Sequence, residues 1–206
     1  MSGYRKYFIQ SIKKNYPANA ALLIATTDNH FEVISKDTAF AKHSANPVDR
    51  RLNFSAYFLA FIKTMDAQGE DFDTIRKICL EIVTAYVMPK NILQQYLKRI
   101  PAKLTNTILF NIFLKKFGVR INRKAHPDGF VATIITDKSE TFGLGYGVDI
   151  IECGICKLFS KHHYERYSSI LCEVDEITSG LAGLQLIRSG TIALGAPICD
   201  FRFKKI

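Results

Sequence analysis

The chain has 206 residues, of which 48% are hydrophobic, and its 28 Lys and Arg against 19 Asp and Glu give a formal net charge of +9. A chain of this length buries about 70% of its unfolded surface and can build a core without disulfides or metals, which excludes a disordered protein. No run approaches the roughly 20 apolar residues of a membrane-spanning helix, and the first residues lack the apolar core of a secretory signal, so we expect a cytoplasmic protein.

The first 118 residues are predicted to be mainly helical. Apolar residues near helical spacing predict a helix over 4–15. Residues 20–27 form an apolar run that periodicity alone does not assign, and residues 28–53 show little sustained period, which indicates mostly loop. Helix signals then predict four more helices, over 54–65, from Asp73 as N-cap to Pro89, over 91–99 before Pro101, and over 103–117 before Gly118.

From Asp128 onward the composition changes to β-branched and glycine-rich segments. Helical character returns over 155–181, with a break near Ser168. We therefore predict an α+β fold, in which a mainly helical N-terminal part is followed by a four-stranded, antiparallel sheet flanked by helices. The four strands are predicted over 130–136, 145–152, 184–189 and 198–204.

The positive charge divides the chain at almost the same place. Residues 1–124 carry 20 basic and 9 acidic side chains, whereas residues 125–206 carry 8 and 10. We therefore distinguish a helical, basic part, 1–124, from an α+β part, 125–206, that holds the catalytic or ligand-binding site, and we expect the two to form one compact unit. No oligomeric state is predicted.

A basic segment over 90–124 concentrates this charge. No acidic residue lies between Glu81 and Asp128, where nine residues are basic. Basic charge beside apolar residues suits contact with a membrane surface, but an ordinary solvated helix face carries the same pattern. No nucleic-acid-binding motif accompanies the segment, so nucleic acid is not an expected partner.

Five cysteines make an odd number, which argues against a secreted disulfide framework. Cys153 follows a predicted strand and begins a helix, where the helix dipole and free N–H groups favour a thiolate. Together with Cys156 it forms a Cys-Gly-Ile-Cys sequence that is either a redox pair, half of a zinc site or local packing. No cofactor is expected, and structural zinc held by the four C-terminal cysteines stays an open alternative.

Polar and reactive side chains recur through the last 40 residues. Cys172 and Asp175 share one face of a predicted helix, which is either its solvated face or the wall of a pocket. In the last strand, Cys199 points with the aromatic residues toward a core or a pocket, and Asp200 points to the other face. Arg188 lies in line with two leucines, either at an exposed strand end or at a pocket rim where it binds an anion.

The residues of the C-terminal part resemble the L-2-amino-thiazoline-4-carboxylate hydrolase family over about 128–204. The family name implies hydrolytic opening of a cyclic amidine, and therefore a small-molecule carboxylate as substrate. The Cys-Asp-Phe ending is the most specific element of the likeness. The matching residues are Glu152-Cys153, Leu171-Cys172, Asp175, Arg188, Thr191, Gly195 and the ending Cys199-Asp200-Phe201-Arg202-Phe203.

The resemblance assigns roles to several of these residues. Cys199 or Cys172 would be the nucleophile, with Asp175 as general acid and base. Arg188 would hold the substrate carboxylate. Two non-enzymatic interpretations remain, a small-molecule-binding or sensor domain and a zinc-stabilised structural domain. The full predicted site comprises the catalytic residues Cys199, Cys172, Asp175 and Cys153 and the substrate-binding residues Arg188 and Asp200.

Overall fold

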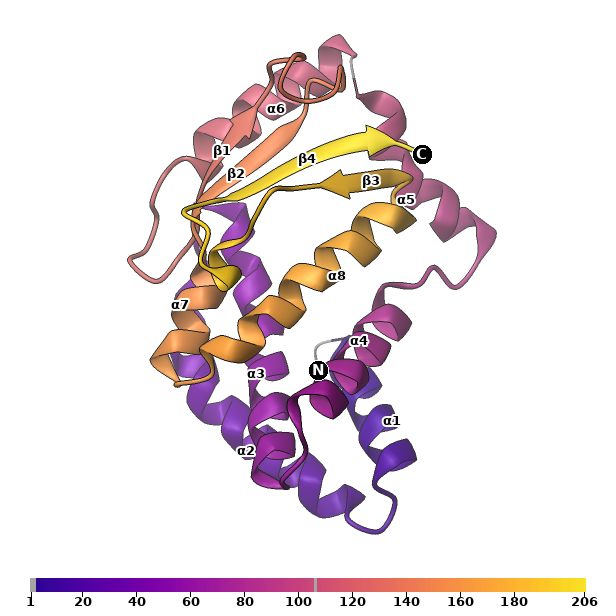
Figure 1. The fold of residues 1–206 in the computed structure, drawn as a ribbon, viewed down its shortest axis with the longest axis vertical. Helices are drawn as coiled ribbons and strands as arrows, with labels where there is room; N and C mark the ends of the chain where they lie inside the picture. The colour runs from indigo at the N-terminus through magenta and orange to yellow at the C-terminus, as the bar shows by residue number, and fades with distance from the viewer. Residues whose placement is uncertain (1–2, 106) are drawn as a thin grey trace.

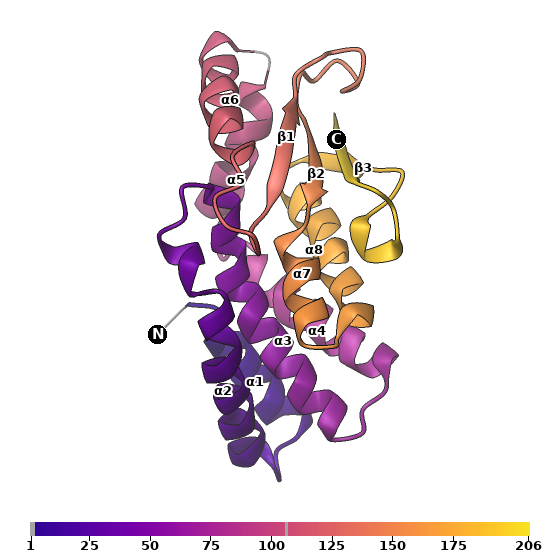
Figure 2. The same cartoon turned by 90° about the vertical axis from the view of Figure 1, so that its left-hand side faces the viewer.

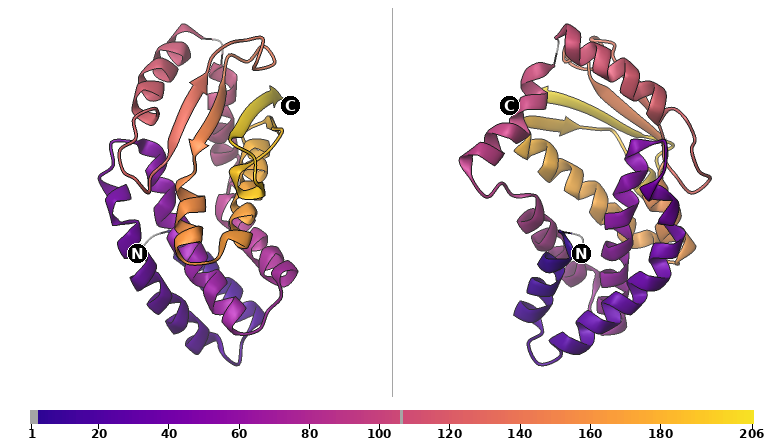
Figure 3. Two further views of the ribbon diagram at one scale, coloured as in Figure 1. Left: turned by 60° about the vertical axis from the view of Figure 1, so that its left-hand side comes forward. Right: turned by 180° about the vertical axis from the view of Figure 1, so that it is seen from behind.

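The computed structural model describes residues 3–105 and 107–206, which fold as a helical layer below a sheet (Figures 1 and 3). The N-terminal helices α1 to α4 form the lower half in Figure 1, and the strands lie at the opposite end. The helices are α1 (Arg5–Asn15), α2 (Ala20–Asp37), α3 (Arg51–Ala67), α4 (Phe72–Val87), α5 (Ile92–Leu104), α6 (Ile108–Ile121), α7 (Gly154–Lys161) and α8 (Ser168–Leu181).

The four strands form one antiparallel sheet in the order β1-β2-β4-β3. Strand β4 lies at the centre beside β2, and the register pairs Ile150 with Cys199 and Val148 with Phe201. The α+β fold predicted from the sequence is thereby confirmed. The strands are β1 (Val131–Ile135), β2 (Gly147–Glu152), β3 (Leu184–Ile187) and β4 (Cys199–Lys205).

The two faces of the sheet differ because side chains alternate along each strand. Cys199, Phe201 and Phe203 of β4 are buried, and Phe201 and Phe203 face residues of α6 and α8. Figure 2 shows from the side how α6 lies beside β1. The opposite face carries polar residues, among them Asp149, which pairs with Arg202 at 2.7 Å. The helices therefore lie on one side of the sheet, and any cavity between sheet and helices is lined by this buried face.

Residues 28–37 correct the prediction of a loop over 28–53, because α2 continues to Asp37. Leu23, Thr27 and Ile34 are buried at helical spacing, and the Thr27 hydroxyl donates to the Leu23 carbonyl at 2.8 Å. Thr27 also contacts the Thr64 hydroxyl of α3 at 3.1 Å. In the sequence, the many polar residues of α2 mask the narrow stripe of buried residues on one face of the helix. Packing of this face against α3 stabilises the helix.

Three helix ends also differ from the prediction. The N-cap of α4 is Asp71, whose carboxylate accepts from the Thr74 N–H at 2.8 Å. Helix α5 contains Pro101 instead of ending before it; it lies at the surface, where a carbonyl that loses its N–H partner is reached by water. Helix α6 continues through Gly118 to Ile121, whose side chain is buried, so burial offsets the low helix propensity of glycine.

The buried apolar residues form one core that extends from Phe8 in α1 to Phe203 in β4. Large aromatic side chains of α3, such as Phe58 and Phe61, are fully buried at its centre. In the part of the chain that the structure describes, none of the helices combines the length and apolarity needed to cross a bilayer.

Candidate functional site

Four thiols from three elements surround one small cavity. Cys153 is the N-cap of α7, Cys156 lies in the first turn of the same helix, Cys172 lies on α8, and Cys199 is the first residue of β4. Asp175 lines the cavity as well. The structure therefore brings together the four residues predicted from the sequence as catalytic, Cys153, Cys172, Asp175 and Cys199.

The cavity is too small for an organic substrate. Its volume of about 20 Å³ is space for about one water molecule. A groove of about 380 Å³ adjoins it and shares with it Arg51, Ile150, Asp175 and Phe201. The groove has the size of ordinary small-molecule sites, so a ligand placed there meets the thiols at one end. Its other lining residues are Pro47, Val48, Phe117, Ile121, Ala132, Tyr146, Val148, Ser179 and Phe203.

An ion pair between Arg51 and Asp175 lies where the cavity meets the groove. The Arg51 guanidinium, at the start of α3, lies 2.6 Å from the carboxylate of Asp175 on α8. The Arg51 side chain keeps 43% of its surface exposed because it lines the open groove. Proximity to Asp175 raises the pKa of Arg51 further above its usual range. Sequence reasoning missed Arg51, since 124 residues separate the partners and no motif surrounds it.

Two buried polar residues hold the start of α3, and with it Arg51, against β1. The Asn46 amide donates to the Phe130 carbonyl at 2.9 Å, and the Phe130 N–H donates to the Asp49 carboxylate at 2.8 Å. Asn46 also caps the short turn before α3 by accepting from the Val48 N–H at 3.0 Å. Buried polar groups with complete hydrogen bonds fix a local geometry, so the position of Arg51 is set by this pair.

Burial makes two of the thiols resistant to ionisation. Burial, followed by the nearby Asp175 charge, raises the pKa of Cys172 to about 12, although the Thr191 hydroxyl acts in the opposite direction. Burial also raises the pKa of Cys199, even though the Ile192 N–H donates to its sulfur at 3.2 Å. Both groups are therefore neutral thiols near pH 7.

The remaining two thiols influence each other. Contact with the Cys156 thiol, followed by burial, raises the pKa of Cys153 well above its usual value. The same contact lowers the pKa of Cys156, and Ser168 adds to this effect. Within this cluster Cys156 is therefore the thiol that ionises most readily. Sequence reasoning left it outside the site, although its position three residues after an N-cap cysteine already placed it on the same helix end.

Arg188 lies outside the lining of both the cavity and the groove. Its guanidinium donates to the Cys172 carbonyl at 3.1 Å and to the Glu176 carboxylate at 2.9 Å. It also stands above the Phe201 ring, 5.9 Å from the centroid. These contacts connect β3 to α8 and fix the position of Cys172, while binding of a substrate carboxylate by Arg188 stays a prediction.

Asp200 lies on the opposite face of the sheet from the thiols. Its carboxylate accepts from the Ser189 N–H at 2.9 Å, the Ser189 hydroxyl at 2.7 Å and the Gly190 N–H at 3.1 Å. These bonds stabilise the turn that follows β3. A substrate-binding role for Asp200 stays a prediction, and the contacts shown here already give the residue a structural function.

The described residues give no support to the alternative of a structural zinc site. Among the residues that the structure describes, no group of three or more His, Cys, Asp or Glu side chains is arranged to hold a metal ion. The buried Thr191 hydroxyl lies near Cys172, but no partner within the described residues meets it with full hydrogen-bond geometry.

Comparison with known proteins gives one match. Residues 50–203 match the family model described as L-2-amino-thiazoline-4-carboxylic acid hydrolase. The matched segment begins at the residue before α3 and ends in β4, so it includes Arg51 and all four clustered cysteines. No curated protein and no solved structure matches the chain.

Proposed function

The chain belongs to the L-2-amino-thiazoline-4-carboxylic acid hydrolase family, and on this basis we propose that it opens the ring of a small cyclic amidine that carries a carboxylate. The observation that carries the proposal is the convergence of four thiols and Asp175 on one cavity at the end of a groove, within the matched segment. Thiols supply a nucleophile for an amidine carbon, and a carboxylate moves the protons.

The volumes support a substrate site in the groove. Because the cavity admits about one water molecule, a five-membered ring lies in the groove with its amidine carbon at the junction. A guanidinium has five N–H donors. Within the described residues, Arg51 donates one hydrogen bond to the Asp175 carboxylate. The others are available to the substrate carboxylate, so we assign the anchoring role to Arg51 ahead of Arg188.

The Cys153 and Cys156 pair is the proposed source of the nucleophile. The Cys156 thiolate attacks the carbon that joins the ring nitrogen and sulfur, a new carbon–sulfur bond forms, and the ring carbon–sulfur bond breaks. The ring sulfur leaves with the proton of the Cys153 thiol. The substrate is then held on Cys156 as an isothiourea that keeps its carboxylate.

Asp175 is proposed to complete the reaction with water. It takes a proton from a water molecule that adds to the isothiourea carbon, and the adduct collapses to a carbonyl as the Cys156 thiolate leaves. One water proton ends on nitrogen and the other returns to Cys153, which balances the reaction. The product is a urea that bears a free thiol. Neutral Cys172 and Cys199 line the same cavity, and each remains a candidate nucleophile from the sequence.

Turnover of L-2-amino-thiazoline-4-carboxylate by the purified chain tests the proposal. Loss of substrate is followed by NMR, a free-thiol reagent detects cleavage of the carbon–sulfur bond, and an amine reagent detects cleavage of the carbon–nitrogen bond. The variants are Cys153→Ala, Cys156→Ala, Cys172→Ala, Cys199→Ala and Asp175→Asn. Cys79→Ala is the matched control, because Cys79 is buried in α4 and lines neither space.

The outcomes separate the hypotheses. Loss of turnover in Cys156→Ala and Asp175→Asn, with activity kept in Cys79→Ala, supports the assignment. Loss confined to Cys172→Ala or Cys199→Ala transfers the nucleophile to that residue. Binding of the substrate without turnover in the unmodified chain would favour the sensor interpretation instead.

A further inference from the structure

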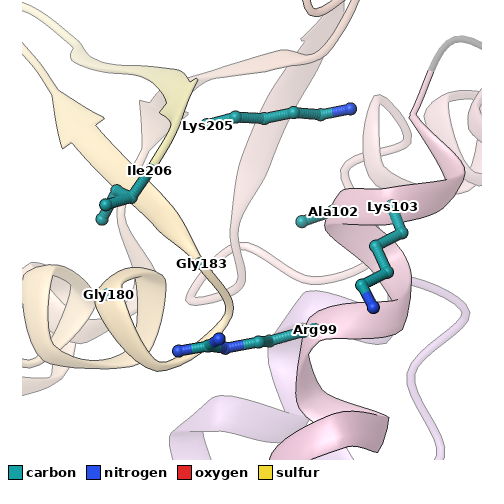
Figure 4. Close-up of a pocket in the computed structure, with 7 residues that line it drawn as sticks. All are labelled: Arg99, Ala102, Lys103, Gly180, Gly183, Lys205 and Ile206. Atoms are coloured by element: carbon teal, nitrogen blue, oxygen red, sulfur yellow. The ribbon is translucent and has the colours of Figure 1, made fainter.

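A second hollow lies away from the thiols, between α5 and the end of β4 (Figure 4). Its volume is about 370 Å³, and Gly180 and Gly183, which have no side chains, form part of its wall. Arg99 and Lys103 reach it from α5, and Lys205 extends across it from the end of β4. None of these residues lines the cavity or the groove of the proposed active site.

The positive charge of the hollow is not compensated by the described part of the protein. Arg99, Lys103 and Lys205 form no ion pair with any described carboxylate. The three acidic residues of the nearby helix α8 are already engaged. Glu173 pairs with Arg76, Glu176 pairs with Arg188, and Asp175 pairs with Arg51. Three cations around an open hollow attract an anion, and the absence of acidic residues between Glu81 and Asp128 keeps the surrounding field positive.

Helix α5 also exposes an apolar stripe, which an ordinary surface helix would turn toward the core. Ile92 is 84% exposed and Leu93 is 65% exposed, and three further large side chains of the stripe are about half exposed, Tyr96, Leu97 and Leu104. Contiguous exposed apolar surface of this kind marks an interaction site.

The hollow and the stripe adjoin each other. The Lys103 ammonium lies 4.5 Å from the centroid of the Tyr96 ring, so a cation of the hollow stands directly over an aromatic residue of the stripe. At a lipid interface, apolar side chains enter the acyl boundary, aromatic rings lie at the headgroup level, and lysine and arginine contact anionic phosphates. On α5, the same three kinds of side chain are exposed next to one another.

We propose that α5 docks on an anionic phospholipid surface, with a headgroup phosphate in the hollow formed by Arg99, Lys103 and Lys205 and with the apolar stripe at the acyl boundary. Charge complementarity selects this occupant, because every charged side chain that lines the hollow is positive and the stripe beside it favours an apolar medium. Each cation near an anionic surface strengthens binding about fivefold. The surface would bring a basic protein to lipid while the groove stays accessible.

Vesicle co-sedimentation of the full chain tests the proposal. Vesicles of phosphatidylcholine alone are compared with vesicles that also contain phosphatidylglycerol. The charge variant is Arg99→Gln/Lys103→Gln/Lys205→Gln, and the stripe variant is Leu93→Gln/Leu97→Gln. Matched controls are Lys13→Gln/Lys36→Gln/Lys42→Gln, which removes the same charge elsewhere, and Leu22→Gln/Val33→Gln, which removes side chains of α2 that are 65% and 61% exposed. Far-UV circular dichroism establishes that each variant is folded.

The expected result is binding to the anionic vesicles only, weakened about 100-fold in the charge variant and clearly reduced in the stripe variant, with both controls unchanged. Binding that is equal on neutral vesicles, or that survives in both variants, overturns the proposal. Stabilisation of the chain by inorganic phosphate without any vesicle binding also overturns it, because the ligand is then a soluble anion. A change of oligomeric state in the stripe variant, measured by light scattering and without vesicle binding, assigns the stripe to a second copy and overturns it as well.

Discussion

The groove at the thiols and the hollow beside α5 are nearly equal in volume, about 380 and 370 Å³, yet the charges in their walls differ. In the groove, apolar side chains surround a single cation, Arg51, which Asp175 balances. In the hollow, three cations face no described acid. The two spaces therefore differ in whether their charged side chains are paired and not in volume, so the pairing is the better guide to the role of each space.

The two regions also differ in how the chain builds them. The thiol site gathers residues from α3, α7, α8 and β4, with the pKa of each thiol altered by burial or by its neighbour. The hollow takes its cations from a basic helix and a strand end that keep contact with solvent. The cations of the hollow therefore lie away from the groups that can perform covalent chemistry, because such groups need burial and partners.

The largest effect is expected from the buried pair that places Arg51. Asp49→Ala removes the acceptor of the Phe130 N–H and leaves a buried donor unpaired, which lowers the free energy of unfolding by about 1–3 kcal/mol. A displaced Arg51 then lowers turnover by about 100-fold. Urea unfolding and the ring-opening assay measure the two effects. Asn53→Ala is the control, because it removes a side-chain bond from α3 to the Arg50 carbonyl at 3.4 Å and leaves the bonds to Phe130 intact. Equal stability in both variants would contradict the assigned role.

The second prediction compares the loss of kcat/KM that follows replacement of Arg51 or Arg188. Arg51→Met removes the cation at the junction of cavity and groove and is expected to lower kcat/KM by about 100-fold. Arg188→Met leaves the groove lining intact and is expected to cost less, mainly through the position of Cys172. Steady-state kinetics of both variants decides between them. A larger loss in Arg188→Met would return the anchoring role to Arg188.

A smaller difference is expected within the thiol cluster itself. Alkylation requires the thiolate, whose population falls as the pH drops below the pKa, so the thiol with a lowered pKa reacts at lower pH. Cys156 is therefore expected to react with iodoacetamide at least about tenfold faster than Cys172 near pH 8, because burial holds the pKa of Cys172 at about 12. Peptide mass spectrometry measures both rates. The Cys153→Ala substitution should slow alkylation of Cys156, because the Cys153 thiol lowers the pKa of Cys156. Buried Cys79 should stay unlabelled.

The smallest effect on turnover is expected at the hollow. Arg99→Gln/Lys103→Gln/Lys205→Gln alters no residue of the cavity or the groove, so kcat/KM should stay within about twofold of the unmodified chain. The ring-opening assay in the absence of lipid measures this. A loss comparable with that of Arg51→Met would mean that the two regions are coupled and not separate.

The amino-acid sequence determined the features that depend on near neighbours. Period two along the last strand placed Cys199 with Phe201 and Phe203 on the buried face, and Asp200 on the other. The change from helical spacing to β-branched segments predicted the α+β order of elements. Side-chain direction within a strand or helix follows from spacings of two to four residues, which a sequence displays directly.

The tertiary structure alone decided which residues meet. Helix α2 beyond residue 27 depends on contact with α3, 37 residues away at the Thr27–Thr64 pair, and Arg51 reaches Asp175 across 124 residues. The lowered pKa of Cys156 likewise depends on tertiary contacts, because the Cys153 thiol and Ser168 of α8 lower it against the opposing effect of burial. No local pattern records such contacts, because packing of distant segments is set by the whole core and by the buried bonds of Asn46 and Asp49.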